Sequence, residues 1–394
     1  MKIAFIIGLP IPYPGAAWTR IESFIKSSMK RGHDVIVICA EKKMKLPYLK
    51  DTFFKRRGFL NAFSFFITTL INILRNEMDM AIISVPPGIH AFGASLACCM
   101  LRKKIVFDYR DQWEDYLINK TANEFKKAAY KILKVIMTFF YSRAALIATV
   151  TPPLVEHLSK RGVKNVHLIP NGADTGLFKP VHEKTSLRAK YGFKGDEFIL
   201  VYSGYIGGYY RLDICIKAFA KIVGINHSKK MKLLLIGEGE DLEKILKLSK
   251  MLKIEENIKY MGVKYDKREI AELIALADVG IIPYDKNPLW KNSLPAKFFE
   301  YASCGVPVIA SVQRQSILAE IIDKEGIGVH VEPEDIEELA NVIKFLCSSD
   351  EHFLKEASRK ARELIEREFD REKISHKFLE MIEKAALIQS PIGF

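Results

Sequence analysis

Short, unbroken runs of valine, isoleucine and leucine recur along this chain, with segments of helical spacing between them. Such runs are typical of strands that are buried on both faces, as in parallel sheets. Their alternation with helices predicts α/β units of the doubly wound type, in which ligands bind beyond the carboxyl ends of the strands. The predicted strands are residues 3–7, 35–39, 80–85, 105–109, 146–150 and 166–169, then 199–202, 232–236, 258–261, 279–283, 307–310 and 327–331.

A polar segment, residues 178–197, separates the two series of strands and has no strand period. The chain has 394 residues, which is more than one ordinary core needs. We therefore predict two doubly wound domains, at residues 1–180 and 190–370, with an interdomain linker between them. An amphipathic helix at residues 371–387 follows the last strand.

The net charge indicates which kinds of molecule this protein binds, and the cysteines indicate the cellular compartment in which it works. The net charge of +13 favours anionic partners such as nucleotides, nucleic acids or acidic lipid headgroups. The six cysteines form no C-x-x-C pair and mostly lie in apolar runs, so we expect buried thiols in a reducing, cytoplasmic environment. There is no zinc-ligand spacing and no D-x-D sequence, and we expect neither a metal nor a cofactor.

The first residues, MKIAFIIGLP, are expected to form a strand. Their apolar run is too short for a signal peptide, stops at Pro10 and lacks a small-residue cleavage site. No stretch offers the roughly 20 apolar residues of a membrane-spanning helix.

The stretch NSLPAKFFEYASCGVPVIAS, which begins at Asn292, is the most informative for function. Asn292 or the serine after it is expected to cap a helix, and Pro295 suits the first helical position. The free N–H groups at a helix start attract an anion such as a diphosphate, which would also explain a cation, Lys297, in the first turn. Glu300 lies about one turn further on, where a carboxylate can accept hydrogen bonds from a ribose diol. The plain alternative is an ordinary buried helix with a solvated lysine and glutamate.

This pattern, P-x-K-x-x-E-Y followed by G-V-P-V-I-A, resembles the donor-binding signature of the retaining family-four glycosyltransferases, in a branch similar to cell-envelope and O-antigen aminosugar transferases. The resemblance covers nearly the whole chain and implies the GT-B fold, in which two Rossmann-like domains face each other across a cleft. The second domain would bind the nucleotide sugar and the first the acceptor, and the helix within residues 371–394 would cross back to the first domain. Members often carry two glutamates eight residues apart, whereas this chain has Asn292 at the first position and Glu300 at the second.

Two loops of the first domain resemble elements of the same family. The loop after the first strand keeps Gly15 but has Ala16 where many relatives have a second glycine. In the family this loop approaches the donor phosphates and the acceptor. The strand end VFDYRDQW resembles an R-D-x-W loop, which implies that Arg110 and Asp111 face the cleft, where a carboxylate can bind the sugar or orient the acceptor hydroxyl. From the residues alone, a structural loop and a simple Arg–Asp ion pair remain open.

A glycine-rich loop in the second domain, residues 201–211, lets backbone come close to a diphosphate. Its glycines are Gly204, Gly207 and Gly208. Many relatives have an arginine and a lysine in this loop, and here Tyr205 and Tyr210 stand at those places. Arg211 and Lys297 are the candidate replacement cations.

Further landmarks of the family fall at other strand ends. The segment IPNGADTGLF matches the family's domain junction, although an Asn-Gly pair is also a strong turn former in any protein. Gly237 and Gly239 are expected to make space near the base and the ribose.

Residues 42–75 combine many basic and aromatic side chains. Such a mixture suits an anionic membrane interface, and it also binds single-stranded nucleic acid. A core-facing helix with a solvated basic face is a third interpretation. Because the family resemblance covers the chain, we expect membrane docking and no nucleic acid, hence a cytoplasmic protein that is peripheral at the membrane.

The sequence thus predicts a retaining, metal-independent glycosyltransferase of the hexosyltransferase type. It would move a sugar from a UDP or GDP sugar to a hydroxyl of a lipid-linked or envelope glycan. The predicted catalytic residues are Asp111, Arg211 and Lys297. The predicted substrate-binding residues are Gly15, Arg110, Gly204, Gly207, Gly237, Asn292, Ser293, Leu294, Pro295 and Glu300.

Two other functions stay open. One is a nucleotide-sugar 2-epimerase of the same fold, which needs a histidine poised for proton transfer, and only His90 lies near a motif loop. The other is a non-catalytic adaptor that binds sugar or membrane, which the missing first glutamate and the replaced cations would fit.

Overall fold

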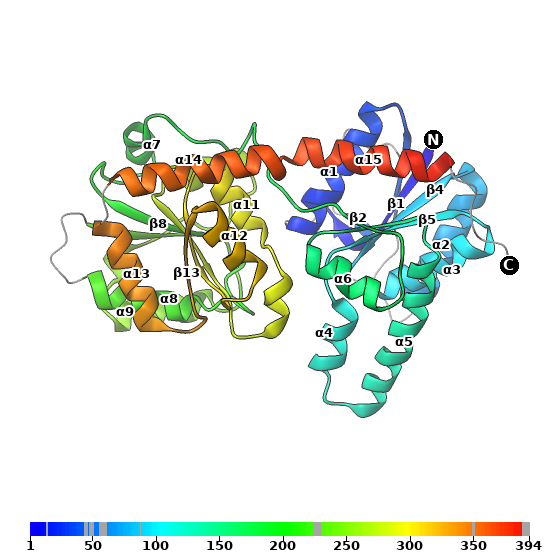
Figure 1. Ribbon diagram of the computed structural model, residues 1–394, viewed down its shortest axis with the longest axis horizontal. Coiled ribbons are helices and arrows are strands. Elements are labelled where there is room, and N and C mark those ends of the chain that lie inside the picture. The colour runs from blue at the N-terminus through cyan, green and yellow to red at the C-terminus, as the bar shows by residue number, and fades with distance from the viewer. Residues whose placement is uncertain are drawn as a thin grey trace. The chain divides into compact units, whose positions relative to one another are not determined.

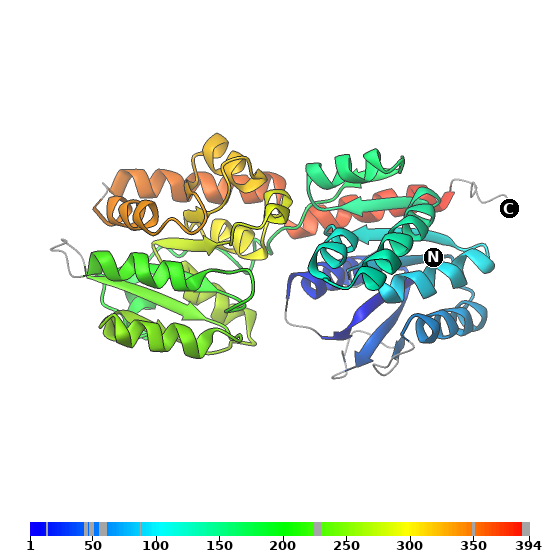
Figure 2. The same ribbon diagram turned by 90° about the horizontal axis from the view of Figure 1, so that it is seen from below.

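The computed structural model describes residues 1–12, 15–42, 46, 51–54, 61–86, 88–223, 230–348 and 351–387. The chain forms two compact units: unit 1 is Met1–Asn171 with Arg371–Phe394, and unit 2 is Gly172–Asp370. In each unit a parallel sheet has helices on both faces (Figures 1 and 2). The predicted α/β fold with two doubly wound units is therefore confirmed.

The described part of unit 1 holds a seven-stranded parallel sheet in the order β3-β2-β1-β4-β5-β6-β7. The strand order reverses between β1 and β4, which is the position where doubly wound sheets bind ligands. The strands are β1 (Lys2–Ile11), β2 (Asp34–Lys42), β3 (Asp51–Phe54), β4 (Met80–Val85), β5 (Lys104–Tyr109), β6 (Leu146–Thr149) and β7 (Val166–Leu168). The helices are α1 (Ala16–Lys30), α2 (Asn61–Asn76), α3 (Ile89–Met100), α4 (Trp113–Lys120), α5 (Glu124–Ser142), α6 (Pro152–Lys160) and α15 (Arg371–Leu387).

Successive side chains of β1 feed two cores on opposite faces of this sheet, as strand geometry requires. Ala4 and Ile6 pack in the core that α2, α3 and α5 cover. Ile3 and Phe5 pack in the core under α1 and α15, where Phe24 and Phe378 stack with their ring centroids 4.1 Å apart. The last helix, α15, thus completes unit 1 although it follows unit 2 in the sequence.

The described part of unit 2 holds a six-stranded parallel sheet in the order β10-β9-β8-β11-β12-β13. Its reversal lies between β8 and β11. The strands are β8 (Phe198–Ser203), β9 (Met231–Ile236), β10 (Ile258–Tyr260), β11 (Val279–Pro283), β12 (Val308–Ser311) and β13 (Gly328–Val331). The α-helices are α7 (Lys184–Lys190), α8 (Leu212–Val223), α9 (Leu242–Met251), α10 (Lys267–Ala275), α11 (Ala296–Ser303), α12 (Ile317–Glu325), α13 (Ile336–Ser348) and α14 (Glu351–Glu368), with 3-10 turns η1 (Glu255–Asn257) and η2 (Pro288–Asn292).

Each predicted strand is present, and the sequence missed one strand, β3. The polar segment expected to be a linker contains α7, which is part of unit 2: Arg188 of α7 donates to Asp278 at 2.7 Å and to the carbonyl of Leu276 at 3.0 Å. The expected buried thiols are confirmed for all six cysteines.

The predicted membrane segment, residues 42–75, lies partly outside the described residues, which omit 43–45, 47–50 and 55–60. Its described helix α2 buries Phe65 and exposes Phe63. No helix in the described part of the chain is both long and apolar enough to cross a bilayer.

Candidate functional site

Two loops of unit 2, after β8 and after β9, pack against each other backbone to backbone. The N–H of Gly204 donates to the carbonyl of Ile236 at 2.9 Å, and the N–H of Ile206 donates to that of Glu238 at 2.8 Å. A Cβ on Gly237 would lie 1.9 Å from the carbonyl oxygen of Gly204, and one on Gly239 would lie 2.0 Å from that of Ile206. The absence of a side chain at Gly237 and Gly239 does make space, but the backbone of the loop after β8 fills that space.

An acidic side chain closes the glycine-rich loop. The N–H of Gly208 donates to Oε1 of Glu240 at 3.0 Å, and a Cβ on Gly207 would lie 2.9 Å from the Glu240 carboxyl carbon. Both glycines have positive φ, 143° and 63°, which other residues rarely adopt. One of the N–H groups expected to bind a diphosphate therefore already donates to a carboxylate.

Lys297 is a buried cation without a hydrogen-bond partner. It lies in the first turn of α11 and is 5% exposed, and its ammonium nitrogen makes no hydrogen bond. The nitrogen sits 3.7 Å from the ring centroid of Tyr202 and 3.5 Å from that of Tyr210, so two aromatic faces provide its main stabilisation. Burial lowers the pKa of Lys297 well below its usual value, while Glu300 and Cys215 act in the opposite direction.

The Lys297 ammonium lies close to an exposed glycine of the glycine-rich loop. A Cβ placed on Gly204 would lie 3.7 Å from Nζ, and Gly204 itself is exposed. A small anion over this glycine could therefore reach an ammonium that has no other ligand.

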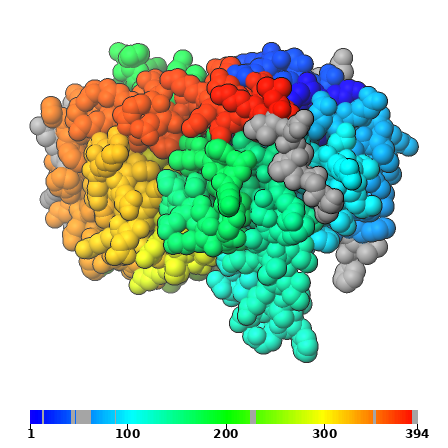
Figure 3. All heavy atoms as spheres, turned by 45° about the vertical axis from the view of Figure 1, so that its right-hand side comes forward, coloured from blue at the N-terminus to red at the C-terminus, as the bar shows by residue number. Residues whose placement is uncertain are grey.

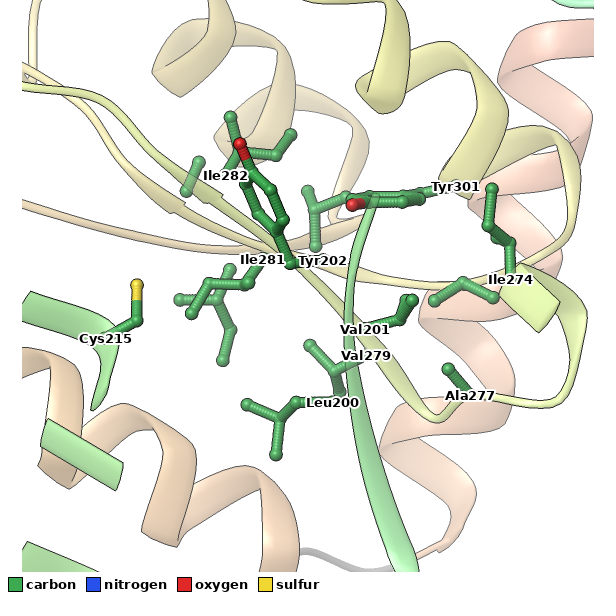
Figure 4. Close-up of a cluster of buried hydrophobic side chains, with 14 of the residues drawn as sticks. Leu200, Val201, Tyr202, Cys215, Ile274, Ala277, Val279, Ile281, Ile282 and Tyr301 are labelled. Carbon is green, nitrogen blue, oxygen red and sulfur yellow. The ribbon is translucent and has the colours of Figure 1, made fainter. Parts of the chain in front are cut away.

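A tyrosine links α11 to the end of β8. The hydroxyl of Tyr301 accepts a hydrogen bond from the N–H of Ser203 at 2.8 Å, and Figure 4 shows the rings of Tyr202 and Tyr301 beside the aliphatic side chains of β8 and β11. Glu300, the residue before Tyr301, is half-buried on the same helix. The tyrosine of the P-x-K-x-x-E-Y pattern thus holds the helix that carries Lys297.

The predicted cap of α11 is wrong. The N-cap residue is Pro295, with no side-chain cap hydrogen bond. Asn292 is the last residue of η2, and Ser293 follows it as the C-cap. The buried Leu294 lies between η2 and the Pro295 N-cap, so neither Asn292 nor Ser293 is the N-cap of α11.

Arg211 is bound by carboxylates of its own unit. Its guanidinium donates twice to Asp213, at 2.8 and 2.9 Å, and once to Glu334 at 2.6 Å. The hydrogen bond to Asp213 raises the pKa of Arg211, and Arg211 in turn lowers the pKa of Asp213. This arginine therefore holds the start of α8.

The predicted residues of unit 1 lie at the carboxyl ends of β1 and β5. Gly15 is the N-cap of α1. Arg110 donates to the carbonyl of Pro86 at 2.5 Å and lies 3.5 Å from a carboxylate oxygen of Asp108. Asp111, which follows it, is exposed as a whole residue. The ion pair therefore forms with Asp108, while burial raises the pKa of the Asp111 carboxyl and the charge of Arg110 acts in the opposite direction.

His90, the histidine on which the epimerase alternative depends, is buried at the start of α3. Its Nε2 lies 3.1 Å from the carbonyl of Ser84, and burial lowers its pKa to about 3. A Cβ on Gly8 would lie 2.1 Å from its other ring nitrogen. A histidine so weakly basic and so enclosed is poorly placed to abstract a proton from a sugar.

The structure thus brings Gly204, Lys297 and Glu300 together in unit 2, while Gly15, Arg110 and Asp111 belong to unit 1. Sequence reasoning missed two contributors, Glu240 and Tyr202. Glu240 gave no signal beyond its place after a G-x-G turn, and Tyr202 is the last but one residue of a buried strand. No cluster of three or more metal-ligating side chains occurs among the residues that the structure describes.

Comparisons with known proteins define the class. Residues 17–177 match the family described as Glycosyltransferase Family 4, and residues 183–364 match Glycosyl transferases group 1. Among solved structures, Anabaena Alr3699/HepE in complex with UDP and glucose has a TM-score of 0.76 and 18% identity over 97% of this chain and 99% of that chain. The fold is therefore GT-B.

Two curated relatives match more locally. N-acetyl-alpha-D-glucosaminyl L-malate synthase of Bacillus anthracis is 28% identical over 245 residues, which is 61% of this chain and 60% of the relative. The putative teichuronic acid biosynthesis glycosyltransferase TuaH of Bacillus subtilis (strain 168) is 24% identical over 217 residues, 53% of this chain and 50% of the relative. The chain thus spans about half to three fifths of the length of these relatives. It belongs to the family-four glycosyltransferases.

Proposed function

We propose that this protein moves a sugar from a UDP or GDP sugar to a hydroxyl of a lipid-linked or envelope glycan, with retention of anomeric configuration. The solved relative that binds UDP supports the donor class, and the teichuronic acid relative supports an envelope acceptor. The name of the malate synthase adds a small hydroxy acid to the acceptors that need testing. The positive net charge fits an anionic sugar-nucleotide donor and an anionic acceptor.

The observation that carries this proposal is the unpartnered ammonium of Lys297 beside Gly204. In the reaction the bond between the anomeric carbon and the diphosphate oxygen breaks, and its electron pair leaves with the diphosphate. Lys297 and the N–H groups at the start of α11 would stabilise this developing charge without a metal ion. Glu300 would hold the ribose. The acceptor oxygen forms the new bond to the anomeric carbon, and its proton passes to the departing diphosphate.

Unit 1 would supply the acceptor side. Asp111, whose carboxyl pKa is raised by burial, would orient the acceptor hydroxyl, and Arg110 and Gly15 would line the same edge of the sheet. Arg211 would act as a positioning residue, because its donors are already bound to Asp213 and Glu334.

The test is a thermal-shift screen of the full chain against UDP, GDP, ADP and CMP, followed by transfer assays with the matching sugar nucleotides. A ligand at 100 times its dissociation constant stabilises a protein by about 2.7 kcal/mol. We expect a clear upward shift in melting temperature with UDP or GDP that Lys297→Ala and Glu300→Ala reduce. Failure of every nucleoside diphosphate to bind would contradict the proposal and favour the adaptor.

The affinity for UDP is expected to fall as the pH rises. Because burial lowers the pKa of Lys297, the free protein releases this proton at lower pH than an ordinary lysine, and the diphosphate favours the charged form. Above the lowered pKa of Lys297 in the free protein, affinity should drop by up to about tenfold per pH unit. Burial raises the pKa of Cys215, Tyr202 and Tyr210, which lie near the Lys297 ammonium. These three groups therefore do not add a charge change of their own to the pH dependence of UDP affinity. Calorimetric titrations across pH would show a flat profile for Lys297→Arg, whose charge persists; an equally steep profile would contradict the assignment.

The same proton gives a matching prediction for stability. Between the lowered pKa of Lys297 in the folded protein and its usual value in the unfolded chain, the unfolded chain binds one more proton. The free energy of unfolding should therefore rise with pH in this window, and Lys297→Met should lack this contribution.

A further inference from the structure

The hairpin of α4 and α5 in unit 1 carries an apolar surface that the proposed reaction does not use. Toward the sheet, α5 buries Met137, Phe140 and Tyr141. Its other side exposes four large apolar side chains: Phe125 (90%), Ile132 (62%), Val135 (71%) and Phe139 (42%). Positions i, i+7, i+10 and i+14 lie on one face of a helix, so these four form a single stripe, which we call the α5 stripe.

The neighbouring helix α3 also exposes large apolar side chains. Phe92 of α3 contacts Phe140 of α5, with ring centroids 6.2 Å apart. Leu96 and Met100 lie one and two turns further along the same face of α3 and are 37% and 60% exposed. In Figure 3 the α4–α5 hairpin (teal) stands clear of the rest of unit 1. Contiguous apolar surface of this kind usually marks an interaction site.

Basic side chains border the α5 stripe. Lys126 and Lys131 are exposed on α5, and the guanidinium of Arg143 lies 3.7 Å from the ring centroid of Phe139. Residues 113–143 contain six lysines and arginines but only three acidic residues.

The acidic residues of the hairpin are already engaged. Glu114 is buried, with Arg161 at 3.3 Å, and Asp115 binds Lys134 at 2.5 Å. The third, Glu124, pairs with Lys127 at 3.4 Å. The charge that the hairpin presents to a partner is therefore positive.

We propose that the α5 stripe is a docking surface for an anionic lipid bilayer. The apolar side chains enter the boundary between headgroups and acyl chains, and the bordering lysines contact acidic headgroups. A second copy of this chain is a poorer occupant, because a symmetric contact would bring the same lysines together. The stripe is distinct from residues 42–75, and the inference does not depend on the proposed transfer reaction.

The test is flotation of the full chain with vesicles of phosphatidylcholine, with and without phosphatidylglycerol. We expect binding that increases with phosphatidylglycerol. Phe125→Ser/Ile132→Ser/Val135→Ser should weaken partitioning by about tenfold or more, because it removes the inserted apolar groups. Lys126→Glu/Lys131→Glu should weaken binding to the anionic vesicles by at least about tenfold and should be without effect on the neutral ones.

A matched control removes exposed apolar side chains elsewhere. Met251 and Tyr265 of unit 2 are 78% and 82% exposed, and Met251→Ser/Tyr265→Ser should bind vesicles like the unmodified chain. The proposal fails if the unmodified chain ignores anionic vesicles, or if the stripe variant and the control bind equally. It also fails if light scattering shows a dimer that only the stripe variant dissociates, since a second copy would then cover the surface. UDP binding by the same samples reports separately on the proposed reaction.

Discussion

Lys297→Met should nearly abolish sugar transfer while making the unliganded protein more stable. The ammonium of Lys297 is buried and has two tyrosine rings but no hydrogen-bond partner. Removing a buried charge that makes no hydrogen bond relieves its desolvation cost, and we expect a gain of about 1 kcal/mol or more in the free energy of unfolding. Removing a cation aimed at the leaving diphosphate should lower kcat/KM by about 100-fold or more.

A rise in the free energy of unfolding together with a fall in kcat/KM would distinguish a functional lysine from a structural one. Urea unfolding measures the first effect, and initial rates with the preferred sugar nucleotide measure the second. The matched control is Lys324→Met, an exposed lysine in the last turn of α12, which should change neither quantity. A less stable Lys297→Met protein with unchanged turnover would show that the lysine serves packing alone.

The fold could be predicted from the sequence because its parallel strands are buried on both faces. β4, for example, is buried at every position and was predicted with its observed bounds. β3 was missed because Asp51–Phe54 is short and lies in a segment dominated by basic and aromatic residues. With an aspartate, a threonine and only two apolar residues, this strand lacks the unbroken apolar run by which the other short strands were predicted.

The site could be predicted only where the chemistry is local. Lys297, in the first turn of α11, followed from the motif itself, and its placement is confirmed. Arg211 looked like a free cation because one of its partners, Glu334, is 123 residues away. Likewise, Glu240 binds Gly208 across 32 residues. Contacts of this range leave no spacing signal in a single sequence.

The largest stability effect is expected from Arg20→Met in unit 1. Arg20 of α1 is 4% exposed and donates to the fully buried carboxylate of Asp108 at 2.8 Å. It also donates to the carbonyls of Ile169 at 2.7 Å and Pro170 at 2.6 Å. Methionine fills similar volume but leaves Asp108 with Arg110 alone, at 3.5 Å, and leaves two carbonyls without this donor. The free energy of unfolding should fall by about 3–5 kcal/mol, as measured by urea unfolding followed by circular dichroism.

A double variant distinguishes the lost charge pair from lost packing. Arg20→Met/Asp108→Asn removes both charges, so it should be more stable than Arg20→Met, because no uncompensated carboxylate stays buried. The matched control, Lys30→Met, changes another residue of α1 and breaks its ion pair with Glu372 of α15, but both side chains are largely exposed, at 72% and 66%. Exposed pairs contribute at most about 1 kcal/mol, so this control should unfold like the unmodified chain. If the double variant were no more stable than Arg20→Met, the stabilisation would have to come from the carbonyl contacts that join α1 to the end of β7.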